Sequence, residues 1–446
     1  MRAVGFDTGS VADYRKFLRL RTLPTYQWRG TTAFVPDEYA GLLDCGDAAS
    51  VSVTANPIDG LFDYQRDIVS LAVRKQKFAV FADCGLGKTL IILEFARHAH
   101  EANGDGNVLI VSPLMVVSQT VEEALRWYGD AMEIDVVTAA ELGEWLESGG
   151  NRIGITNYEA IRDGLPHGRL KGLVLDESSM LKSHYGKWGK RLIRMGRGVP
   201  FKLCATGTPA PNDRIEYANH AVFLDHFRTT NEFLARYFVN RGETQDRWEI
   251  KPHALRPFYR DLSHWCIFLS NPAVYGWQDN SESIPPIHVH IENVPLTPEQ
   301  RKACQSLTGG LMVKSAGGIG QRGKLSQIAK GRWNGKNIPT NKPGYIRDRV
   351  DSWPDESTLI WCRYNAEQDS MEDVFPGAGS IRGETPHESR ERMIAEFKAA
   401  EMRQIISKPK ILGFGLNLQV ATRQVFSGLL GRVVLSGSPL VIEAKS

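Results

Sequence analysis

The sequence predicts an α/β protein with two lobes, each built on a parallel sheet. Short apolar runs rich in β-forming residues alternate with helical stretches between residues 57 and 225, as in a doubly wound parallel sheet. A second set of apolar runs, at 357–362 and 403–407, flanks a helix-like stretch. The length of 446 residues is sufficient for two or three domains, so both lobes fit in one chain.

Five strands are expected in the first lobe, and four segments are expected along the chain. The strands are predicted at 78–81, 108–111, 152–156, 172–175 and 202–205. The segments are an N-terminal extension (1–56), the first lobe (57–225), a helical and basic insertion (226–345) and an incomplete second lobe (346–446). The insertion is predicted because an aromatic-rich helical segment, followed by a Gly-rich basic segment, interrupts the alternation of strands and helices.

The composition argues against several classes of protein. A net charge of +3, with 42% apolar and 24% charged residues, is typical of a globular protein. The six cysteines are scattered singly, which argues against a disulfide framework or a CxxC zinc site and favours a reducing, cytoplasmic location. No apolar run is long enough to span a membrane, so no membrane partner is expected.

A candidate phosphate loop lies in the segment FAVFADCGLGKTLIILEFAR, which predicts a strand, a tight loop and a helix. In such a loop, backbone N–H groups at glycines hold phosphates, a lysine reaches the β- and γ-phosphates, and a hydroxyl binds Mg²⁺. Gly85, Gly87, Lys88 and Thr89 are the candidates for these roles. Alanine replaces the first glycine of the general pattern, and an ordinary strand-to-helix turn is the alternative.

A candidate acidic pair follows the predicted strand GLVLD, which ends in Asp176 and continues with Glu177. A carboxylate at the end of a strand beside a phosphate loop can hold Mg²⁺, and a second one can orient the attacking water. We therefore predict Asp176 as a metal residue and Glu177 as the general base. A simple N-cap for the next helix is the alternative.

Seven segments in a fixed order resemble motifs of the superfamily 2 helicases, and the chain is similar to their Swi/Snf-like translocases of phages and prophages. Beside the phosphate loop, the segments are FDYQRDIV (Q motif), VLIVSPLMVVSQT (Ia), ITNYEAI (Ib), LDESSMLK (II), CATGTPAPN (III), TLIWCRYNAE (IV) and ISKPKILGFGLNLQ (V). The resemblance covers about residues 57–426. In motif II, Ser179 stands where the family commonly has a histidine.

The resemblance implies two RecA-like lobes of a P-loop NTPase, with ATP and Mg²⁺ as cofactors. It implies that Gln65 contacts adenine. It further implies that motifs III and V couple the two lobes, through Thr206 and Thr208 in the first lobe and Gly415 and Asn417 in the second. Motif III read without the other motifs is more typical of a plain turn.

The final residues, SGLLGRVVLSGSPLVIEAKS, do not resemble motif VI, the family's helix with arginine fingers. We therefore expect a truncation before motif VI. An arginine finger is worth roughly 10³ to 10⁵ in rate, so slow ATP hydrolysis is expected.

A strongly basic stretch covers residues 301–350, where eleven Lys and Arg face one acidic residue. Basic residues with interspersed glycines suit a surface that follows nucleic-acid phosphates, although a solvated basic face is the alternative. Arg322, Lys324, Lys330 and Arg332 are the candidate phosphate contacts.

The resemblance implies an ATP-dependent DNA helicase or translocase, acting on duplex DNA in preference to single strands, in the cytoplasm of a bacterial or phage-infected cell. A hydrolysis-impaired nucleic-acid-binding remnant is the alternative. A P-loop kinase is a further alternative, against which motifs IV and V argue.

Overall fold

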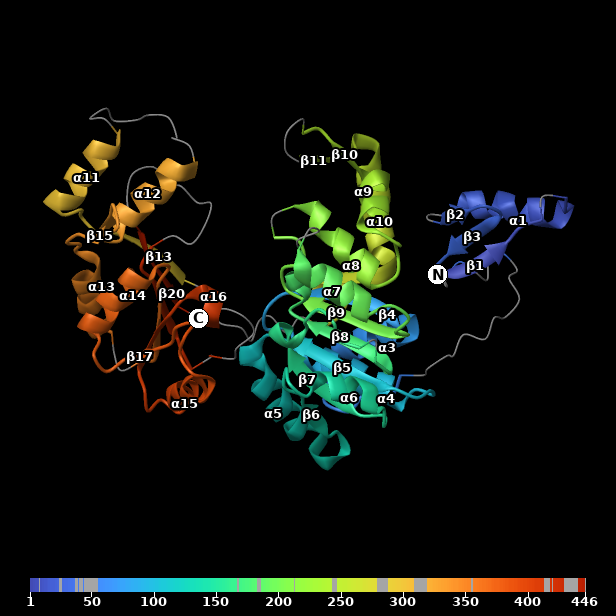
Figure 1. Cartoon of the computed structure of the whole chain (residues 1–446), viewed down its shortest axis with the longest axis horizontal. Coiled ribbons are helices and arrows are strands. Elements are labelled where there is room, and N and C mark those ends of the chain that lie inside the picture. Colours follow the sequence, from blue (N-terminus) through green and yellow to red (C-terminus); the bar gives the residue numbers. More distant parts are fainter. Residues whose placement is uncertain are drawn as a thin grey trace. The chain divides into compact units, whose positions relative to one another are not determined.

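The computed structural model forms two compact units, Met1–Asp279 and Asn280–Ser446. It describes all residues except 8, 24–25, 37–38, 40–42, 44–54, 167, 183–185, 212, 243–246, 279–287, 309–318, 354–355, 413–417, 419, 429–439 and 446. Each unit contains its own sheet and helices (Figure 1).

The first unit is centred on a seven-stranded sheet in the order β12-β4-β9-β8-β5-β7-β6, and all of its strand pairs are parallel. The strands are β4 (Lys77–Ala82), β5 (Asn107–Ser112), β6 (Ile134–Val136), β7 (Ile153–Asn157), β8 (Leu170–Asp176), β9 (Phe201–Thr206) and β12 (Cys266–Leu269). Its central strands are almost completely buried, as expected of parallel strands that are covered on both faces.

Side chains that alternate along each central strand enter two separate cores, one on each face of this sheet. In β4, Phe81 belongs to one core, whereas Phe78 and Val80 belong to the other. The core that contains Phe78 and Val80 is completed by α3 (Asp63–Lys75), α4 (Lys88–Glu101) and α5 (Val117–Tyr128). The core that contains Phe81 is completed by α6 (Leu142–Ser148), α7 (Lys187–Met195), α8 (Tyr217–Phe223), α9 (Thr230–Tyr237) and α10 (Leu255–Trp265). A short hairpin, β10 (Phe238–Asn240) and β11 (Trp248–Ile250), lies between α9 and α10 in the chain.

The N-terminal residues of the first unit form a small antiparallel sheet, β1-β3-β2, together with helix α1. The elements are β1 (Arg2–Gly5), α1 (Val11–Thr22), β2 (Gln27–Arg29) and β3 (Thr32–Val35). This sheet contacts the remainder of the unit through Gln27, whose Nε2 donates to the carbonyl of His226 at 2.6 Å.

The second unit is centred on a six-stranded mixed sheet in the order β13-β20-β19-β16-β18-β17. Four of its strands run parallel, namely β16 (Thr358–Trp361), β17 (Gly379–Ser380), β18 (Gln404–Ser407) and β19 (Arg423–Phe426). The strand β20 (Leu440–Lys445) runs antiparallel to β19 and to β13 (His288–Asn293).

Among the residues of the second unit that the structure describes, six helices accompany this sheet. They are α11 (Pro298–Thr308), α12 (Ile319–Ala329), α13 (Lys342–Asp351), α14 (Asn365–Val374), α15 (His387–Lys398) and α16 (Pro409–Leu412), and a two-residue hairpin, β14 (Arg332–Trp333) with β15 (Lys336–Asn337), follows α12.

All five strands predicted for the first lobe are present, and the fold class is α/β as predicted. The boundaries differ from the prediction, because the first unit extends to residue 279 and not to 225. The physical reason is β12, which pairs in parallel with β4 and so draws the helical segment before it into the first unit. Residues from 280 onward belong to the second unit, including much of the predicted insertion.

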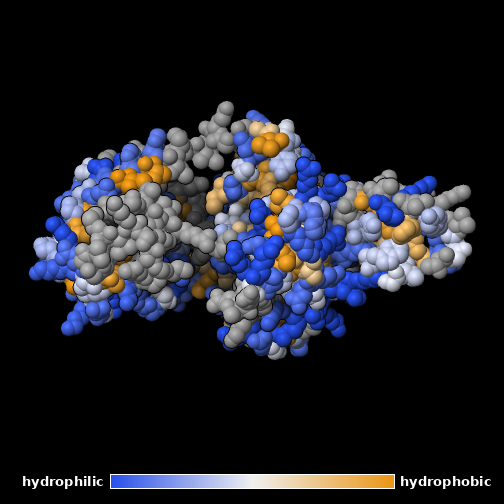
Figure 2. Space-filling model, turned by 90° about the horizontal axis from the view of Figure 1, so that it is seen from above, coloured by the Kyte–Doolittle hydropathy of each residue, from blue (hydrophilic) through white to orange (hydrophobic). Residues whose placement is uncertain are grey.

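On the face seen in Figure 2, the coloured surface is mainly hydrophilic, with hydrophobic residues gathered in separate groups. In the part of the chain that the structure describes, no helix is both long enough and apolar enough to cross a membrane.

Candidate nucleotide site

The segment between β4 and α4 forms a tight turn in which two glycines have positive φ, 85° at Gly85 and 62° at Gly87. Gly87 caps α4, which begins at Lys88. The left-handed backbone at Gly87 favours glycine, and a Cβ there would lie 2.2 Å from Nε2 of Gln65 and would displace the Gln65 amide. The turn therefore presents the N-terminus of a long helix, the arrangement that binds phosphates.

Lys88 folds back over this loop. Its Nζ donates to the carbonyl of Ala82 at 2.8 Å and to that of Asp83 at 3.0 Å. Thr89 follows in the first turn of the helix and is half-buried. The lysine cation is thus held beside the backbone of the phosphate loop by neutral acceptors, which charged phosphate oxygens can replace with stronger bonds.

Gln65 joins helix α3 to the phosphate loop. Its Oε1 accepts from the backbone N–H of Phe62 at 3.0 Å, and its Nε2 donates to the carbonyl of Gly87 at 3.3 Å. The Gln65 side chain is buried, whereas the Phe62 ring is half exposed and stacks on Tyr64 at 5.7 Å. The structure therefore places the residue predicted to contact adenine directly against the loop.

Asp176 ends β8 and is held there by its neighbours. Ser112, at the end of the adjacent strand β5, donates its hydroxyl to Oδ2 of Asp176 at 2.9 Å. Burial raises the pKa of Asp176 to about 6, while the Ser112 hydroxyl and the Lys88 cation act in the opposite direction. The carboxyl group thus lies inside the protein, unlike an exposed helix cap.

Glu177 has a left-handed backbone, with φ of 53°, and accepts two hydroxyl groups at one carboxylate oxygen. Ser179 Oγ donates to its Oε1 at 2.6 Å, and Thr206 Oγ1 donates to the same oxygen at 2.7 Å. The backbone N–H of Thr208 donates in turn to Thr206 Oγ1 at 3.0 Å. Motif III is therefore bonded to motif II, and Ser179, in the place of the family's histidine, helps to fix the carboxylate.

These groups converge because their strands are neighbours. The order β4-β9-β8-β5 brings together the phosphate loop, Thr206, the acidic pair and Ser112 at the carboxyl ends of four adjacent parallel strands. A Cβ at Gly207, directly after β9, would lie 3.8 Å from Nζ of Lys88. Ligands of open α/β sheets bind at this edge.

The groups near the loop suit a magnesium ion. Mg²⁺ prefers hard oxygen ligands and is usually bound by one or two carboxylates together with substrate phosphates. The Asp176 carboxylate and the Thr89 hydroxyl are such ligands, and a cation would offset the burial that raises the pKa of Asp176. Across the described residues, no cluster of three or more His, Cys, Asp and Glu forms a metal site by itself.

A buried contact next to the acidic pair, between Ser178 and His220, was not predicted from the sequence. Ser178 Oγ lies 3.1 Å from Nε2 of His220, and burial lowers the pKa of His220 to about 4. The neutral ring therefore ties α8 to motif II. No local pattern signals it, because the two residues are 42 positions apart.

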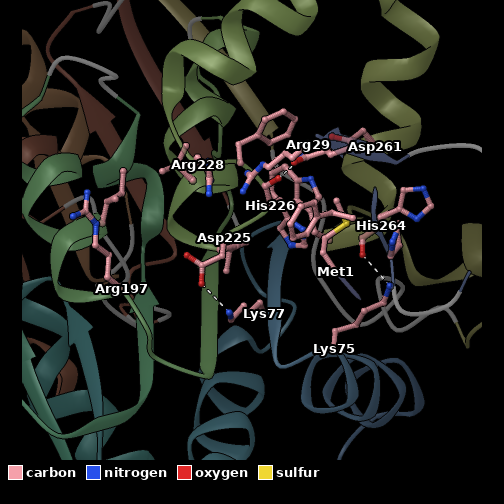
Figure 3. Close-up of a pocket in the computed structure, with 18 residues that line it drawn as sticks. Met1, Arg29, Lys75, Lys77, Arg197, Asp225, His226, Arg228, Asp261 and His264 are labelled. Atoms are coloured by element: carbon pink, nitrogen blue, oxygen red, sulfur yellow. Dashed lines mark hydrogen bonds and ion pairs between the residues drawn. The ribbon is translucent and has the colours of Figure 1, made fainter. Parts of the chain in front are cut away.

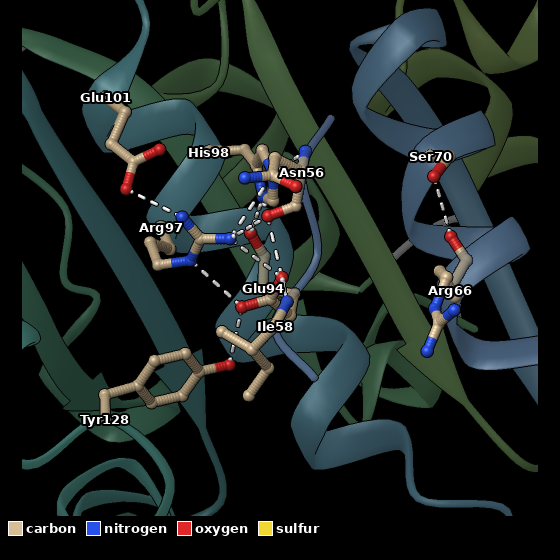
Figure 4. Close-up of polar contacts among 9 residues, drawn as sticks. All are labelled: Asn56, Ile58, Arg66, Ser70, Glu94, Arg97, His98, Glu101 and Tyr128. Atoms are coloured by element: carbon tan, nitrogen blue, oxygen red, sulfur yellow. Dashed lines mark hydrogen bonds and ion pairs between the residues drawn. The ribbon is translucent and has the colours of Figure 1, made fainter. Parts of the chain in front are cut away.

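A polar cluster on α4, away from the phosphate loop, holds the segment that precedes α3 (Figure 4). Glu94 is fully buried and accepts from Arg97 at 3.0 Å, from Tyr128 at 2.8 Å and from the backbone N–H of Ile58 at 3.2 Å. Arg97 also donates to the carbonyl of Asn56 at 2.7 Å. The cluster thus connects residues 56–58 to the helix that starts at the phosphate loop.

The residues predicted to contact nucleic acid differ in their exposure to solvent. Lys324 and Arg332 are exposed. It contradicts the contact predicted for Lys330, whose side chain is 3% exposed and whose Nζ lies 3.1 Å from Glu367 Oε1, because a buried ion pair is not available to a phosphate. The Arg322 side chain lies outside the described part of the chain, as do the motif V residues Gly415 and Asn417.

Comparison with known families identifies the domain. Residues 64–341 match the SNF2-related domain. The chain belongs to the SNF2-related family. It therefore carries a domain of the kind found in ATPases that are related to DNA helicases and translocases.

Individual relatives of this SNF2-related chain match over part of its length. It is 27% identical over 187 residues to the mouse DNA annealing helicase and endonuclease ZRANB3, covering 40% of this chain and 17% of that protein. It is 30% identical over 203 residues to the Arabidopsis thaliana ATP-dependent DNA helicase DDM1, covering 39% of this chain and 26% of that protein. The matched region thus spans about a quarter or less of these relatives.

Solved structures that match part of this chain include the Sulfolobus solfataricus SWI2/SNF2 ATPase core in complex with dsDNA. The sequence identity is 20% and the TM-score is 0.41, with 84% of this chain and 83% of that chain covered. The SWI2/SNF2 ATPase core domain of the same organism matches with 19% identity and a TM-score of 0.42, covering 84% of this chain and 81% of that chain.

Proposed function

We propose that this SNF2-related chain is an ATP-driven motor that moves along DNA, with duplex favoured over single strands. The observation that carries the proposal is the position of Glu177, fixed by two hydroxyl groups beside Asp176 and the phosphate loop. The names of the relatives, which are DNA helicases, favour DNA over RNA as the track.

In the proposed reaction, ATP phosphates displace the two carbonyl groups that Lys88 contacts, and the N–H groups at Gly85 and Gly87 hold the β-phosphate. Thr89 and Asp176 would hold Mg²⁺, and the ion would neutralise charge on the transferred phosphate. Water-activating chemistry then needs a fixed carboxylate near the γ-phosphate.

Glu177 supplies that carboxylate. Its Oε1 is occupied by the hydroxyls of Ser179 and Thr206, so its other oxygen is oriented to accept a proton from the attacking water. Thr206 and Thr208 connect Glu177 to the rest of motif III through hydrogen bonds, so a movement of the Glu177 side chain during hydrolysis would shift motif III. We propose that hydrolysis is coupled to movement in this way. The family resemblance assigns Gly415 and Asn417 the matching role in the second lobe.

We further propose that DNA phosphates contact exposed cations of the second unit, with Lys324 and Arg332 as the described candidates and Arg322 as a third. Each phosphate contact contributes about −0.9 to the slope of log affinity against log salt concentration. Replacing Arg332 by Ala should therefore reduce the magnitude of this slope by about 1. An unchanged slope would remove Arg332 from the DNA surface.

A steady-state ATPase assay with duplex DNA, single-stranded DNA and RNA side by side tests the function. We expect the strongest stimulation by duplex DNA, loss of activity in Lys88→Ala, and a decrease of about 10²- to 10⁴-fold in Glu177→Gln. Lys398→Ala is the matched control, because Lys398 is exposed on α15 in the second unit. Movement is measured by displacement of a third strand from a triplex.

Equal DNA-dependent ATPase rates in the wild type and in Lys88→Ala would contradict the motor. DNA binding that persists without ATP turnover would instead support the alternative, a hydrolysis-impaired nucleic-acid-binding protein. The phage or prophage type and the location in a bacterial or phage-infected cell stay predictions of the sequence.

A further inference from the structure

A cavity of about 530 Å³ lies in the first unit, between the small N-terminal sheet and the large sheet (Figure 3). Its walls come from β2 and β3 of the small sheet, from the end of α3 and the start of β4, from α7 and the residues that follow it, from the end of α8 and the residues that follow it, and from the end of α10. The volume is typical of a pocket for a small organic ligand.

The cavity is distinct from the candidate nucleotide site. Lys77, the first residue of β4, lines the cavity, whereas the phosphate loop begins after Ala82, the last residue of the same strand. A strand rises about 3.3 Å per residue, so the two ends of β4 are roughly 16 Å apart. A ligand in the cavity therefore contacts the amino ends of the strands, opposite the edge where ATP is proposed to bind.

The cavity has an excess of positive charge. Five Lys and Arg side chains and two Asp side chains line it. Lys77 is already neutralised by Asp225 at 2.8 Å. In the described part of the chain, Arg197 and Arg228 have no carboxylate within ion-pair distance, and the guanidinium of Arg29 lies over the Phe34 ring at 4.8 Å. Three guanidinium groups are thus available to an anion.

The cavity is also lined by a pair of stacked aromatic rings. His226 and Trp265 line it and stack on one another, with ring centroids 5.5 Å apart. Nε2 of His226 and Nε1 of Trp265 are buried and have no hydrogen-bond partner among the described residues. Burial lowers the pKa of His226, so its ring is neutral. A neutral imidazole has one acceptor nitrogen, while an indole N–H is only a donor.

We propose that this cavity binds a phosphate ester of nucleotide size, with its phosphate at Arg197 and Arg228 and a polar ring near His226 and Trp265. Planar guanidinium groups bind phosphate oxygens through paired hydrogen bonds. The half-buried ring of His226, which is backed by Trp265, gives a planar ring of the ligand a face to stack on, and a bare inorganic anion does not use that face. The phosphate ester comes either from a free nucleotide or from the 5′-phosphorylated end of a strand.

Calorimetric titration of the full chain with AMP tests this site, without DNA or ATP, so that its outcome is independent of motor activity. AMP lacks the β- and γ-phosphates on which the phosphate loop acts. We expect AMP to bind equally well to the wild type and to Lys88→Ala. Arg197→Ala and Arg228→Ala should each weaken binding by about tenfold to a hundredfold, the usual effect of losing a charged hydrogen bond.

Arg126→Ala is the matched control, because Arg126 is an exposed arginine on α5 that does not line the cavity, and it should bind AMP as the wild type does. Arg197 and Arg228 are also exposed, so both variants are expected to fold, which equal melting temperatures would show.

Parallel titrations with a 5′-phosphorylated tetranucleotide and its 5′-hydroxyl counterpart distinguish the two sources. Tighter binding of AMP identifies a free nucleotide, and tighter binding of the phosphorylated tetranucleotide identifies a strand end. The proposal is overturned if neither AMP nor the phosphorylated tetranucleotide binds at millimolar concentration. It is also overturned if Lys88→Ala abolishes binding, or if both arginine variants bind like the wild type.

Discussion

Replacing Lys330 by Met is a sharp test of how the basic stretch of the second unit is used. The Lys330 side chain is 3% exposed and that of Glu367 is 4% exposed, and Lys330 Nζ lies 3.1 Å from Glu367 Oε1. Methionine retains most of the length and packing of lysine but removes its charge. The substitution therefore leaves a buried carboxylate without its cation.

The expected cost follows from the other contacts of Glu367. Breaking a buried ion pair by removal of one partner costs about 3–5 kcal/mol. Glu367 still accepts the backbone N–H of Arg363 at 2.6 Å and the hydroxyl of Ser427. The nearby Lys342, whose pKa burial and the Lys330 cation lower to about 8, carries most of its positive charge at neutral pH and offsets part of the Glu367 charge. We therefore expect the low end of the range, about 3 kcal/mol.

Urea unfolding of the full chain, followed by circular dichroism, measures this cost as an earlier transition of the second unit. Lys324→Met is the control, because Lys324 is exposed on α12, and its stability should change by less than about 0.5 kcal/mol. Adding Glu367→Leu to Lys330→Met removes both buried charges and should recover part of the loss. If Lys330→Met unfolds at the urea concentration of the wild type but binds DNA more weakly, the reasoning is wrong and Lys330 is a phosphate contact.

Three further predictions concern the candidate nucleotide site. Thr206→Val removes one of two hydroxyls from Glu177, so ATP turnover should decrease about 10- to 100-fold. Because the Thr208 N–H also loses its acceptor, stability should decrease by about 1–3 kcal/mol, and a loss of stability at unchanged turnover would indicate a purely structural role. Because burial raises the pKa of Asp176 to about 6, its carboxyl is neutral below that pH, and Mg²⁺ affinity measured with ATP should decrease up to tenfold per unit as the pH falls below 6. Asp176→Asn should reduce this pH dependence to that of Mg²⁺ binding by free ATP, whose terminal phosphate also titrates near pH 6, and a variant that keeps the full dependence would show that another group of the protein titrates. Gly87→Ala should displace the Gln65 amide, since its Cβ would lie 2.2 Å from Nε2, and lower the melting temperature by several degrees; wild-type stability in a scanning calorimeter would contradict this.

The central strands of the first lobe could be predicted because parallel strands that are buried on both faces have nearly continuous apolar sequences. The edge strands β6 and β12 were missed for the opposite reason. They have three and four residues, and both include exposed or half-buried positions. β12 also follows more than fifty residues of mainly helical chain after β9, so its pairing with β4 is a long-range event with no local signal.

The phosphate loop and the acidic pair could be predicted because each is a compact motif at a strand end. The hydrogen bonds that hold these motifs in place could not be predicted from the sequence. Ser112 reaches Asp176 across 64 residues, and only the order of strands in the sheet brings the two together. The prediction for Lys330 was wrong because a count of charges along the chain does not register burial, and its partner Glu367 lies 37 residues later.

The cluster around Glu94 shows that the start of the recognised family domain is not a folding boundary. The family match begins at residue 64, yet Asn56 and Ile58 bond to α4 through Arg97 and Glu94. An expressed fragment that starts at residue 64 loses those partners and leaves buried acceptor capacity of Glu94 unused. Any shortened version of the protein intended for biochemistry or crystallisation should therefore begin before Asn56.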